Sequence, residues 1–176
     1  IPVKLALFGC DGRRLPLRLQ GETRAGGDER VIELDLASKR FVFEDVGTAP
    51  VPSLLRGLSA PVILDCDYAP DELAVLLRHD VDGYNRWEAS QQLAARAYDA
   101  AYGGNTAAQP LHAWGETLAA LFDGNALDNA LMAALLTPPG EVVLAERRAE
   151  NDPAAVHAAH ELLQAALARL ARVAAV

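Results

Sequence analysis

The sequence is poor in cysteine, in long apolar runs and in basic residues. Cys10 and Cys66 are too few for a secreted disulfide framework; they favour reduced thiols in a cytoplasmic protein, although they could pair if the fold brought them together. No apolar run reaches membrane-spanning length and Ile1 opens no signal peptide, so the sequence predicts no membrane partner. Lys and Arg number 16 against 24 Asp and Glu, and the net charge of -8 excludes a nucleic-acid partner, because phosphate contacts require surplus basic side chains.

The rest of the composition is that of a globular protein. Hydrophobic residues make up 51% and charged residues 23% of the 176 positions. This length allows one domain or two small ones, each with a real core. The chain starts at Ile1, without Met, inside a predicted strand, so we expect it to be an excised part of a longer protein.

The first third of the chain alternates apolar and polar residues with the period of half-buried strands. Pro16 cannot donate to a ladder, so its strand is predicted to be bulged or at a sheet edge. Short turns and the lack of intervening helices predict an antiparallel β-sandwich-like part over residues 1–68. The expected strands contain Val3, Leu5 and Leu7; Leu15, Leu17 and Leu19; residues 31–36; residues 41–43; and residues 62–66.

Past Asp67 the period becomes helical. Pro70 suits a first helical position, Asp82 is a candidate N-cap, and Asp152-Pro153 precedes a long last helix. Further helices are expected after Pro110 and around Leu127, Leu131 and Leu135, with turns at Gly103-Gly104-Asn105 and Asp123-Gly124-Asn125. Residues 69–176 therefore predict an all-α, superhelical-type array, and the whole chain an α+β fold in two parts.

Three groups of residues invite a metal-binding interpretation. His157, His160 and Glu161 share one helix, but neither the spacing nor the order is that of a zinc-peptidase helix. The acidic group Asp65, Asp67, Asp71 and Glu72 is explained more simply by a solvated strand end and the positive end of a helix dipole. Asp123-Gly124-Asn125 with Asp128 fails as a calcium loop, because Asp128 stands where the loop requires Gly.

The sequence contains no recognisable arrangement for nucleophilic or acid–base catalysis either. Ser53, Ser59 and Ser90 lie outside any nucleophile elbow, and neither cysteine has a basic neighbour that would activate it. His79, beside Arg78 and Asp80, is better explained as structural, and Tyr84 and Trp87 as core aromatics. The sequence thus predicts no catalytic, cofactor-binding or metal-ligating residue in this chain.

An ordered series of short segments nevertheless resembles bacterial aminopeptidase N, a family of alanyl-type, zinc-dependent gluzincin aminopeptidases. The resemblance is strong to about Leu93 and thinner beyond it, through Glu141 and Asp152-Pro153. The segments that carry it are Ile1-Pro2-Val3-Lys4-Leu5-Ala6-Leu7, Phe41-Val42-Phe43, Pro50-Val51-Pro52-Ser53-Leu54-Leu55-Arg56, Ser59-Ala60-Pro61-Val62, Leu76-Leu77-Arg78-His79-Asp80, Asn85-Arg86-Trp87-Glu88-Ala89 and Gln92-Leu93.

The resemblance implies a supporting role. The family's zinc ligands, catalytic Glu and substrate-anchoring motif lie in another domain and have no counterpart here, so zinc belongs to the expected full-length parent only. The matching region is the β-sandwich domain and the start of the helical domain, whose implied role is to brace the catalytic domain and restrict peptide access. The expected partners are the rest of the parent polypeptide and its peptide substrates.

Two further expectations concern association. If both ends are cut, an unpaired sheet edge and the apolar stripe of Val156, Leu163, Leu167 and Leu170 are exposed, so we expect the isolated chain to self-associate. The alternative function is an independent protein- or peptide-binding module without an enzymatic parent.

Overall fold

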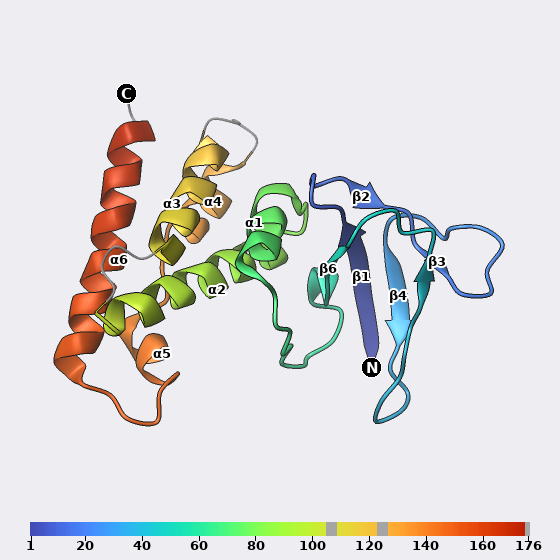
Figure 1. Ribbon diagram of the computed structural model, residues 1–176, viewed down its shortest axis with the longest axis horizontal. Helices are drawn as coiled ribbons and strands as arrows, with labels where there is room; N and C mark the ends of the chain where they lie inside the picture. The colour runs from blue at the N-terminus through green and yellow to red at the C-terminus, as the bar shows by residue number, and fades with distance from the viewer. Residues whose placement is uncertain (105–108, 123–126, 175–176) are drawn as a thin grey trace. The chain divides into compact units, whose positions relative to one another are not determined.

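The computed structural model describes residues 1–104, 109–122 and 127–174 (Figure 1). The chain divides into two compact units, Ile1–Arg86 and Trp87–Val176, which we describe separately as unit 1 and unit 2. The expected turn at Asp123-Gly124-Asn125 and the Asn105 end of the earlier turn lie outside the described residues. No helix within the described ranges is both long and apolar enough to cross a membrane.

Unit 1 is built around strand β1 (Pro2–Phe8), which pairs antiparallel with three other strands. These partners are β2 (Arg14–Leu15), β4 (Arg30–Glu33) and β6 (Val51–Ser53), and the separate pair β3 (Arg18–Leu19) and β5 (Phe43–Glu44) forms a second small sheet. The antiparallel sandwich-like prediction is therefore confirmed. The core clusters on the inner faces are Leu5, Leu7 and Leu17, packed against Leu15, Ile32, Phe43 and Leu54, and Val3, Leu55 and Ala60.

The individual strands are shorter than the sequence predicts. The single strand expected around Pro16 is split into β2 and β3, which join different sheets, because Pro16 has no N–H with which to continue a ladder. The strand expected over residues 31–36 covers only Arg30–Glu33, and the one over 41–43 covers Phe43–Glu44. Residues 62–66, expected as the last strand, pair with no strand of the described chain, and that prediction is wrong.

The helical part of unit 1 begins with α1 (Pro70–His79). Pro70 stands at its start, and the Glu72 carboxylate accepts a hydrogen bond of 2.7 Å from the Ala69 amide, which satisfies one of the free N–H groups of the first turn. Leu73, Leu76 and Leu77 form the buried stripe, as their spacing predicts. Helix α2 (Gly83–Tyr102) follows, and the Asp82 carboxylate caps it by accepting the Asn85 amide at 3.0 Å, which confirms the expected N-cap.

A strained turn joins β6 to the end of the sandwich-like part. It is the 3₁₀ helix η1 (Arg56–Leu58); Leu55, directly before it, and Gly57 and Leu58 within it have φ values of 54°, 61° and 53°. Leu55 is buried, whereas Leu58 is exposed. Left-handed backbone at a residue with a Cβ costs on the order of 1 kcal/mol or more, so surrounding contacts must hold this turn in place.

In the described part of unit 2, the rest of α2 is followed by four further helices. These are α3 (Gln109–Phe122), α4 (Asn129–Leu135), α5 (Glu141–Ala145) and α6 (Pro153–Ala174), the last drawn in red in Figure 1. Leu127 precedes α4 rather than belonging to it, and Asp128 caps α4 by accepting from the amides of Ala130 and Leu131 at 2.8 and 3.0 Å. The predicted all-α part is confirmed.

The apolar stripe of α6 forms part of the core of unit 2. Val156, Leu163 and Leu167 are 5%, 0% and 8% exposed, because α6 packs against α3 and α5. The expected exposure of the stripe is therefore wrong for these three residues, whereas Leu170 is half-buried, and self-association of the chain stays a prediction. Trp114 of α3 is fully buried, and its Nε1–H donates to Ser90 Oγ at 3.1 Å.

Candidate functional site

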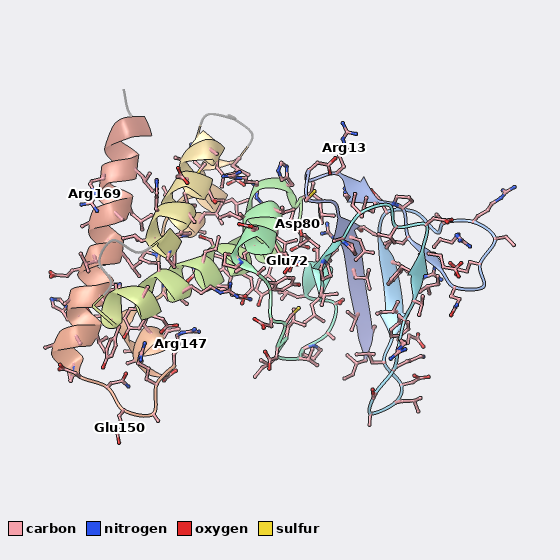
Figure 2. All side chains as sticks on the ribbon, in the orientation of Figure 1. Arg13, Glu72, Asp80, Arg147, Glu150 and Arg169 are labelled. Carbon is pink, nitrogen blue, oxygen red and sulfur yellow. The ribbon has the colours of Figure 1, made fainter. Side chains whose placement is uncertain are left out.

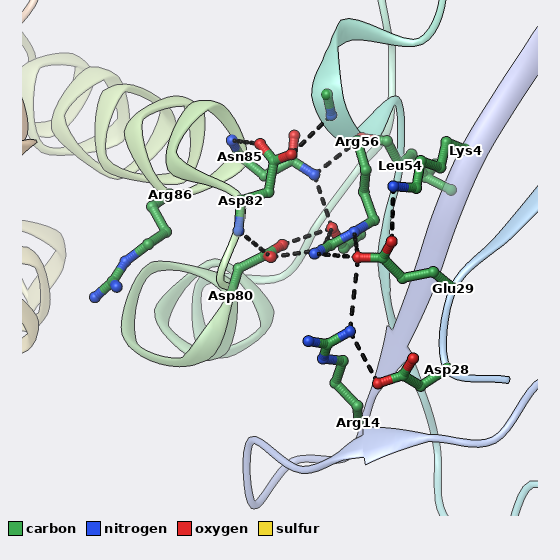
Figure 3. Close-up of polar contacts among 12 residues, drawn as sticks. Lys4, Arg14, Asp28, Glu29, Leu54, Arg56, Asp80, Asp82, Asn85 and Arg86 are labelled. Atoms are coloured by element: carbon green, nitrogen blue, oxygen red, sulfur yellow. Dashed lines mark hydrogen bonds and ion pairs between the residues drawn. The ribbon is translucent and has the colours of Figure 1, made fainter.

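The most unusual feature of unit 1 is a cluster of buried polar side chains (Figure 3). It brings together Ser53 from β6, Arg56 from η1, Asp80 at the end of α1 and Asn85 in the first turn of α2. We call these four residues the buried network. Each is less than 9% exposed, and a cluster of this kind is rare in a core unless every group has a partner.

An ion pair lies at the centre of the buried network. Arg56 Nη1 is 2.5 Å from Asp80 Oδ1, and the two side chains are 2% and 0% exposed. The second Nη1 hydrogen of Arg56 is directed to Ser53 Oγ at 2.8 Å, and its Nε donates to Glu29 Oε1 at 3.0 Å. A guanidinium supplies five donors in a fixed plane, so Arg56 can reach oxygens of Asp80, Ser53 and Glu29 at the same time.

The Ser53 hydroxyl is fully occupied. It donates to Asp80 Oδ2 at 2.5 Å and accepts from Arg56 Nη1 at 2.8 Å and from Asn85 Nδ2 at 2.7 Å. A hydroxyl has one hydrogen and two lone pairs, so no lone pair remains for attack on a substrate. Ser53, which is 0% exposed, therefore serves as a connector rather than as a nucleophile.

The same cluster connects the end of α1 and the start of α2 to the strained turn at η1. Asn85 Nδ2 donates to the Leu54 carbonyl at 3.1 Å, and Asp82 Oδ2 accepts from the Gly57 amide at 2.7 Å. Asp80 Oδ1 in turn accepts from the Asp82 amide at 2.9 Å. These bonds fix the left-handed backbone on both sides of Arg56, and they supply the contacts that the strain requires.

Around the buried network lies an outer ring of charges that is partly open to solvent. Glu29 connects the two layers, since it binds Arg56 and also lies 2.7 Å from Lys4 Nζ and 3.6 Å from Arg14 Nη1. Arg14 also pairs with Asp28 at 2.9 Å. The ring carries charges of both signs, which Figure 3 shows as one continuous set of dashed contacts.

The electrostatics follow from these contacts. Burial lowers the pKa of Arg56, but the hydrogen bond and charge of Asp80, together with Glu29, outweigh it and raise the pKa overall. The hydrogen bond from Lys4 lowers the pKa of Glu29, against the effect of burial and with the help of Arg56. The charged forms of Arg56 and Glu29 are thus both favoured, which stabilises the paired geometry.

The sequence does not predict the buried network, because the contacts that join Ser53 and Arg56 to Asp80 and Asn85 span 24 to 32 residues and follow no local pattern. One signal was present. Asp80 directly follows a helix, where the negative end of the helix dipole disfavours an acid. An acid at that position, with an arginine inside the apolar run around Leu54-Leu55-Arg56, indicates a compensating ion pair.

The histidines considered as metal ligands lie in unit 2, on α6. His157 Nδ1 is 2.7 Å from Glu141 Oε1 of α5, and His160 Nδ1 is 3.5 Å from the same oxygen. His157 Nε2 is 3.5 Å from Glu161, so the imidazole is engaged by carboxylates on both sides. Over the ranges that the structure describes, no three His, Cys, Asp or Glu side chains form a group able to hold a metal ion. The contacts of His157 and His160 with Glu141 are those of a surface ion pair.

The His157–Glu141 pair predicts a pH dependence. The Glu141 hydrogen bond raises the pKa of His157, and His157 lowers the pKa of Glu141. The His157 contribution is present below a pH of about 6.5 and is lost as pH rises through its raised folded-state pKa; the Glu141 contribution is present above about 4.5 and is lost as pH falls through its lowered one. His157→Gln should therefore lower the melting temperature at pH 5.5 more than at pH 8.5.

Thermal melts at both pH values test this, with His112→Gln on α3 as the matched control for loss of an exposed histidine. Equal shifts at the two pH values for His157→Gln would contradict the ion pair.

The other candidate residues from the sequence also have structural positions. Ser59 Oγ accepts from the Lys4 amide at 2.9 Å, and Ser90 Oγ donates to the Leu135 carbonyl at 3.1 Å. Cys10 and Cys66 are free thiols, and burial raises the pKa of Cys66, which disfavours the thiolate. Burial and the nearby Arg78 lower the pKa of His79.

The remaining candidates from the sequence are acidic or aromatic. Glu72 lies at the start of α1 (Figure 2). The side chains of Asp65, Asp67, Asp71 and Tyr84 are exposed, and Trp87 is half-buried.

Comparison with known proteins agrees with both parts of the chain. Residues 1–67 match the family described as "Domain of unknown function (DUF3458) Ig-like fold", and residues 70–174 match "Domain of unknown function (DUF3458_C) ARM repeats". The crystal structure of Legionella pneumophila aminopeptidase A in complex with aspartic acid superposes with a TM-score of 0.71 at 24% identity, over 99% of this chain and 19% of that one, and this likeness shows the fold.

Sequence relatives point the same way. The chain is 33% identical to aminopeptidase N of Escherichia coli over 172 residues, 33% identical to that of Caulobacter vibrioides and 31% identical to that of Haemophilus influenzae. Each alignment covers 93–96% of this chain but only 18–19% of the relative, so the chain spans about a fifth of their length. Since the matched families account for both the sandwich-like and the helical part, the chain belongs to the DUF3458_C family of ARM-repeat domains, joined to an Ig-like DUF3458 domain, and is homologous to bacterial aminopeptidase N.

Proposed function

We propose that this chain is a non-catalytic segment of a zinc-dependent, cytoplasmic aminopeptidase that removes N-terminal residues from peptides. Within that enzyme it braces the catalytic domain and helps to form the chamber through which substrates enter. The observation that carries the proposal is the continuous match of 93–96% of the chain, across both parts, to proteins named aminopeptidase N.

The geometry of unit 1 supports a bracing role. A bracing segment has to keep one conformation, and in the buried network the Arg56–Asp80 ion pair, which is removed from solvent, is joined by short hydrogen bonds to the neutral side chains of Ser53 and Asn85. Such networks favour one arrangement over its alternatives because each displaced group would be left buried without a partner. The saturated Ser53 and the paired Arg56 support a role without chemistry.

Enzymatic assays test the proposal. This chain alone should release no alanine from an alanyl substrate, whereas the longer protein translated from the same reading frame should release it and should lose that activity to a chelator. The longer frame should contain a His-Glu-x-x-His motif upstream of Ile1. Chelator-sensitive hydrolysis by the 176-residue chain alone would refute the non-catalytic role.

The second candidate function is an independent protein- or peptide-binding module. The exposed apolar side chains of Val142 and Val143 on α5, 72% and 58% exposed, are the observation that favours it. A reading frame that opens near Ile1 would select this function over the first.

A further inference from the structure

Residues 62–66 of unit 1, with the sequence Val-Ile-Leu-Asp-Cys, have the composition of a strand but lie in no sheet of the described chain. Their apolar side chains face solvent, since Ile63 is 99% exposed and Val62 and Leu64 are 42% and 38% exposed. Three exposed apolar residues in a row are unusual in a segment held between two buried residues, Ala60 and Tyr68, each one position beyond its exposed neighbours. The strand propensity of this segment is thus unused within the chain.

The backbone of the same segment is open as well. The Val62 amide donates to the Ala60 carbonyl and the Tyr68 amide to the Cys66 carbonyl, both at 3.0 Å and within the same loop, and Tyr68 anchors one flank through its hydroxyl, which donates to the Pro52 carbonyl at 2.8 Å. Between them, the amides of residues 63–66 donate to no acceptor in the described ranges. A segment of strand-like composition with free backbone donors can form main-chain hydrogen bonds with a strand placed beside it.

We propose that residues 62–66 are a docking strand, which pairs edge to edge with a strand from the part of the longer aminopeptidase outside this chain. This inference rests on the proposed function. The alignments to aminopeptidase N cover nearly all of this chain yet only about a fifth of each relative, so this segment is flanked in those proteins by a much longer polypeptide. A second copy of the chain is the weaker occupant, because each copy carries a net charge of -8.

The charge of Asp65 predicts which side chains the partner strand carries. Asp65 is exposed within the segment, and a carboxylate on one strand stabilises a Lys or Arg directly opposite on its neighbour. The partner strand is therefore expected to be apolar opposite Ile63 and basic opposite Asp65. Like charges at that position would disfavour the pairing by a comparable amount.

Amide hydrogen exchange tests the docking strand, in this chain and in the longer protein side by side. In the 176-residue chain the amides of residues 63–66 should exchange without protection. In the longer protein they should be slowed by about 100-fold or more, because a paired strand exchanges only on local opening. Equal, fast exchange in both proteins would overturn the proposal, and so would protection in this chain that rises with its concentration, which would assign the strand to a second copy.

A pair of variants adds a readout that does not depend on exchange. Ile63→Asp should leave the melting temperature of this chain nearly unchanged, because the side chain is exposed, but should lower that of the longer protein. The matched control is Leu36→Asp, an exposed apolar residue of the same unit at 68% exposure. An inactive longer protein that still protects residues 63–66 would refute the proposed function alone, and an active one that leaves them unprotected would refute the docking strand alone.

Discussion

Asp80→Ala is expected to lower the free energy of unfolding of unit 1 by about 3–5 kcal/mol, because it leaves the Arg56 guanidinium buried without its counter-charge. The guanidinium is 2% exposed and cannot recover its hydration without opening the core. Ser53 would lose its acceptor in the same substitution, and the Asp82 amide would lose Oδ1. Hydrogen exchange at the β1 amides, read as a function of urea, measures the loss in unit 1 specifically.

Two comparisons separate the buried charge from other effects. Asp28→Ala removes a half-exposed carboxylate that pairs with Arg14, and it should cost less than about 1 kcal/mol. Arg56→Met combined with Asp80→Ala should cost less than the sum of the single changes by about 0.5–3 kcal/mol, because neither charge is then left alone. A loss below about 1 kcal/mol for Asp80→Ala, or strict additivity in the cycle, would contradict the central role of this ion pair.

Trp114→Ala is expected to destabilise unit 2 by about 3–5 kcal/mol, since it opens a large cavity at a fully buried position. The indole fills the space beneath α3 and also donates to Ser90 Oγ at 3.1 Å, which in turn donates to the Leu135 carbonyl. Removal of the indole therefore takes away both packing and one hydrogen-bond donor. Exchange rates of the α6 amides under increasing urea report the change in this unit.

Trp114→Phe is the matched control for this site. It keeps most of the ring volume and loses the donor, so the expected cost is smaller, about 1–2 kcal/mol. If the two variants were equally destabilised, the hydrogen bond to Ser90 rather than the cavity would set the stability of the site.

Local patterns in the sequence predict much of this fold. Pro70 and Asp82 mark the helix starts correctly because capping depends on residues within one turn of each other. The buried stripe of α1 likewise follows from the helical period alone. Both the two-part architecture and the resemblance to aminopeptidase N are recognisable for the same reason, since they rest on short stretches read in order.

What the sequence does not predict depends on contacts between distant segments. Whether residues 62–66 pair as a strand is decided by the availability of a neighbouring edge, which no local pattern encodes. The burial of Leu163 depends on α3 and α5 reaching α6, and the pairing of Arg56 with Asp80 depends on a turn that only left-handed backbone allows. Each of these outcomes is fixed by tertiary packing, which overrides the local preference.

The buried network also decides how this protein can be cut into pieces. The family matches meet between residues 67 and 70, which invites dissection there. A polypeptide ending at that junction would keep Arg56, Ser53 and Glu29 but lose Asp80, Asp82 and Asn85, so Arg56 would lose its buried counter-charge and the strained turn would lose the hydrogen bonds from the helix termini. A polypeptide that contains the sandwich-like part alone should therefore extend through Arg86, the last residue of unit 1, so that it includes α1 and the first turn of α2.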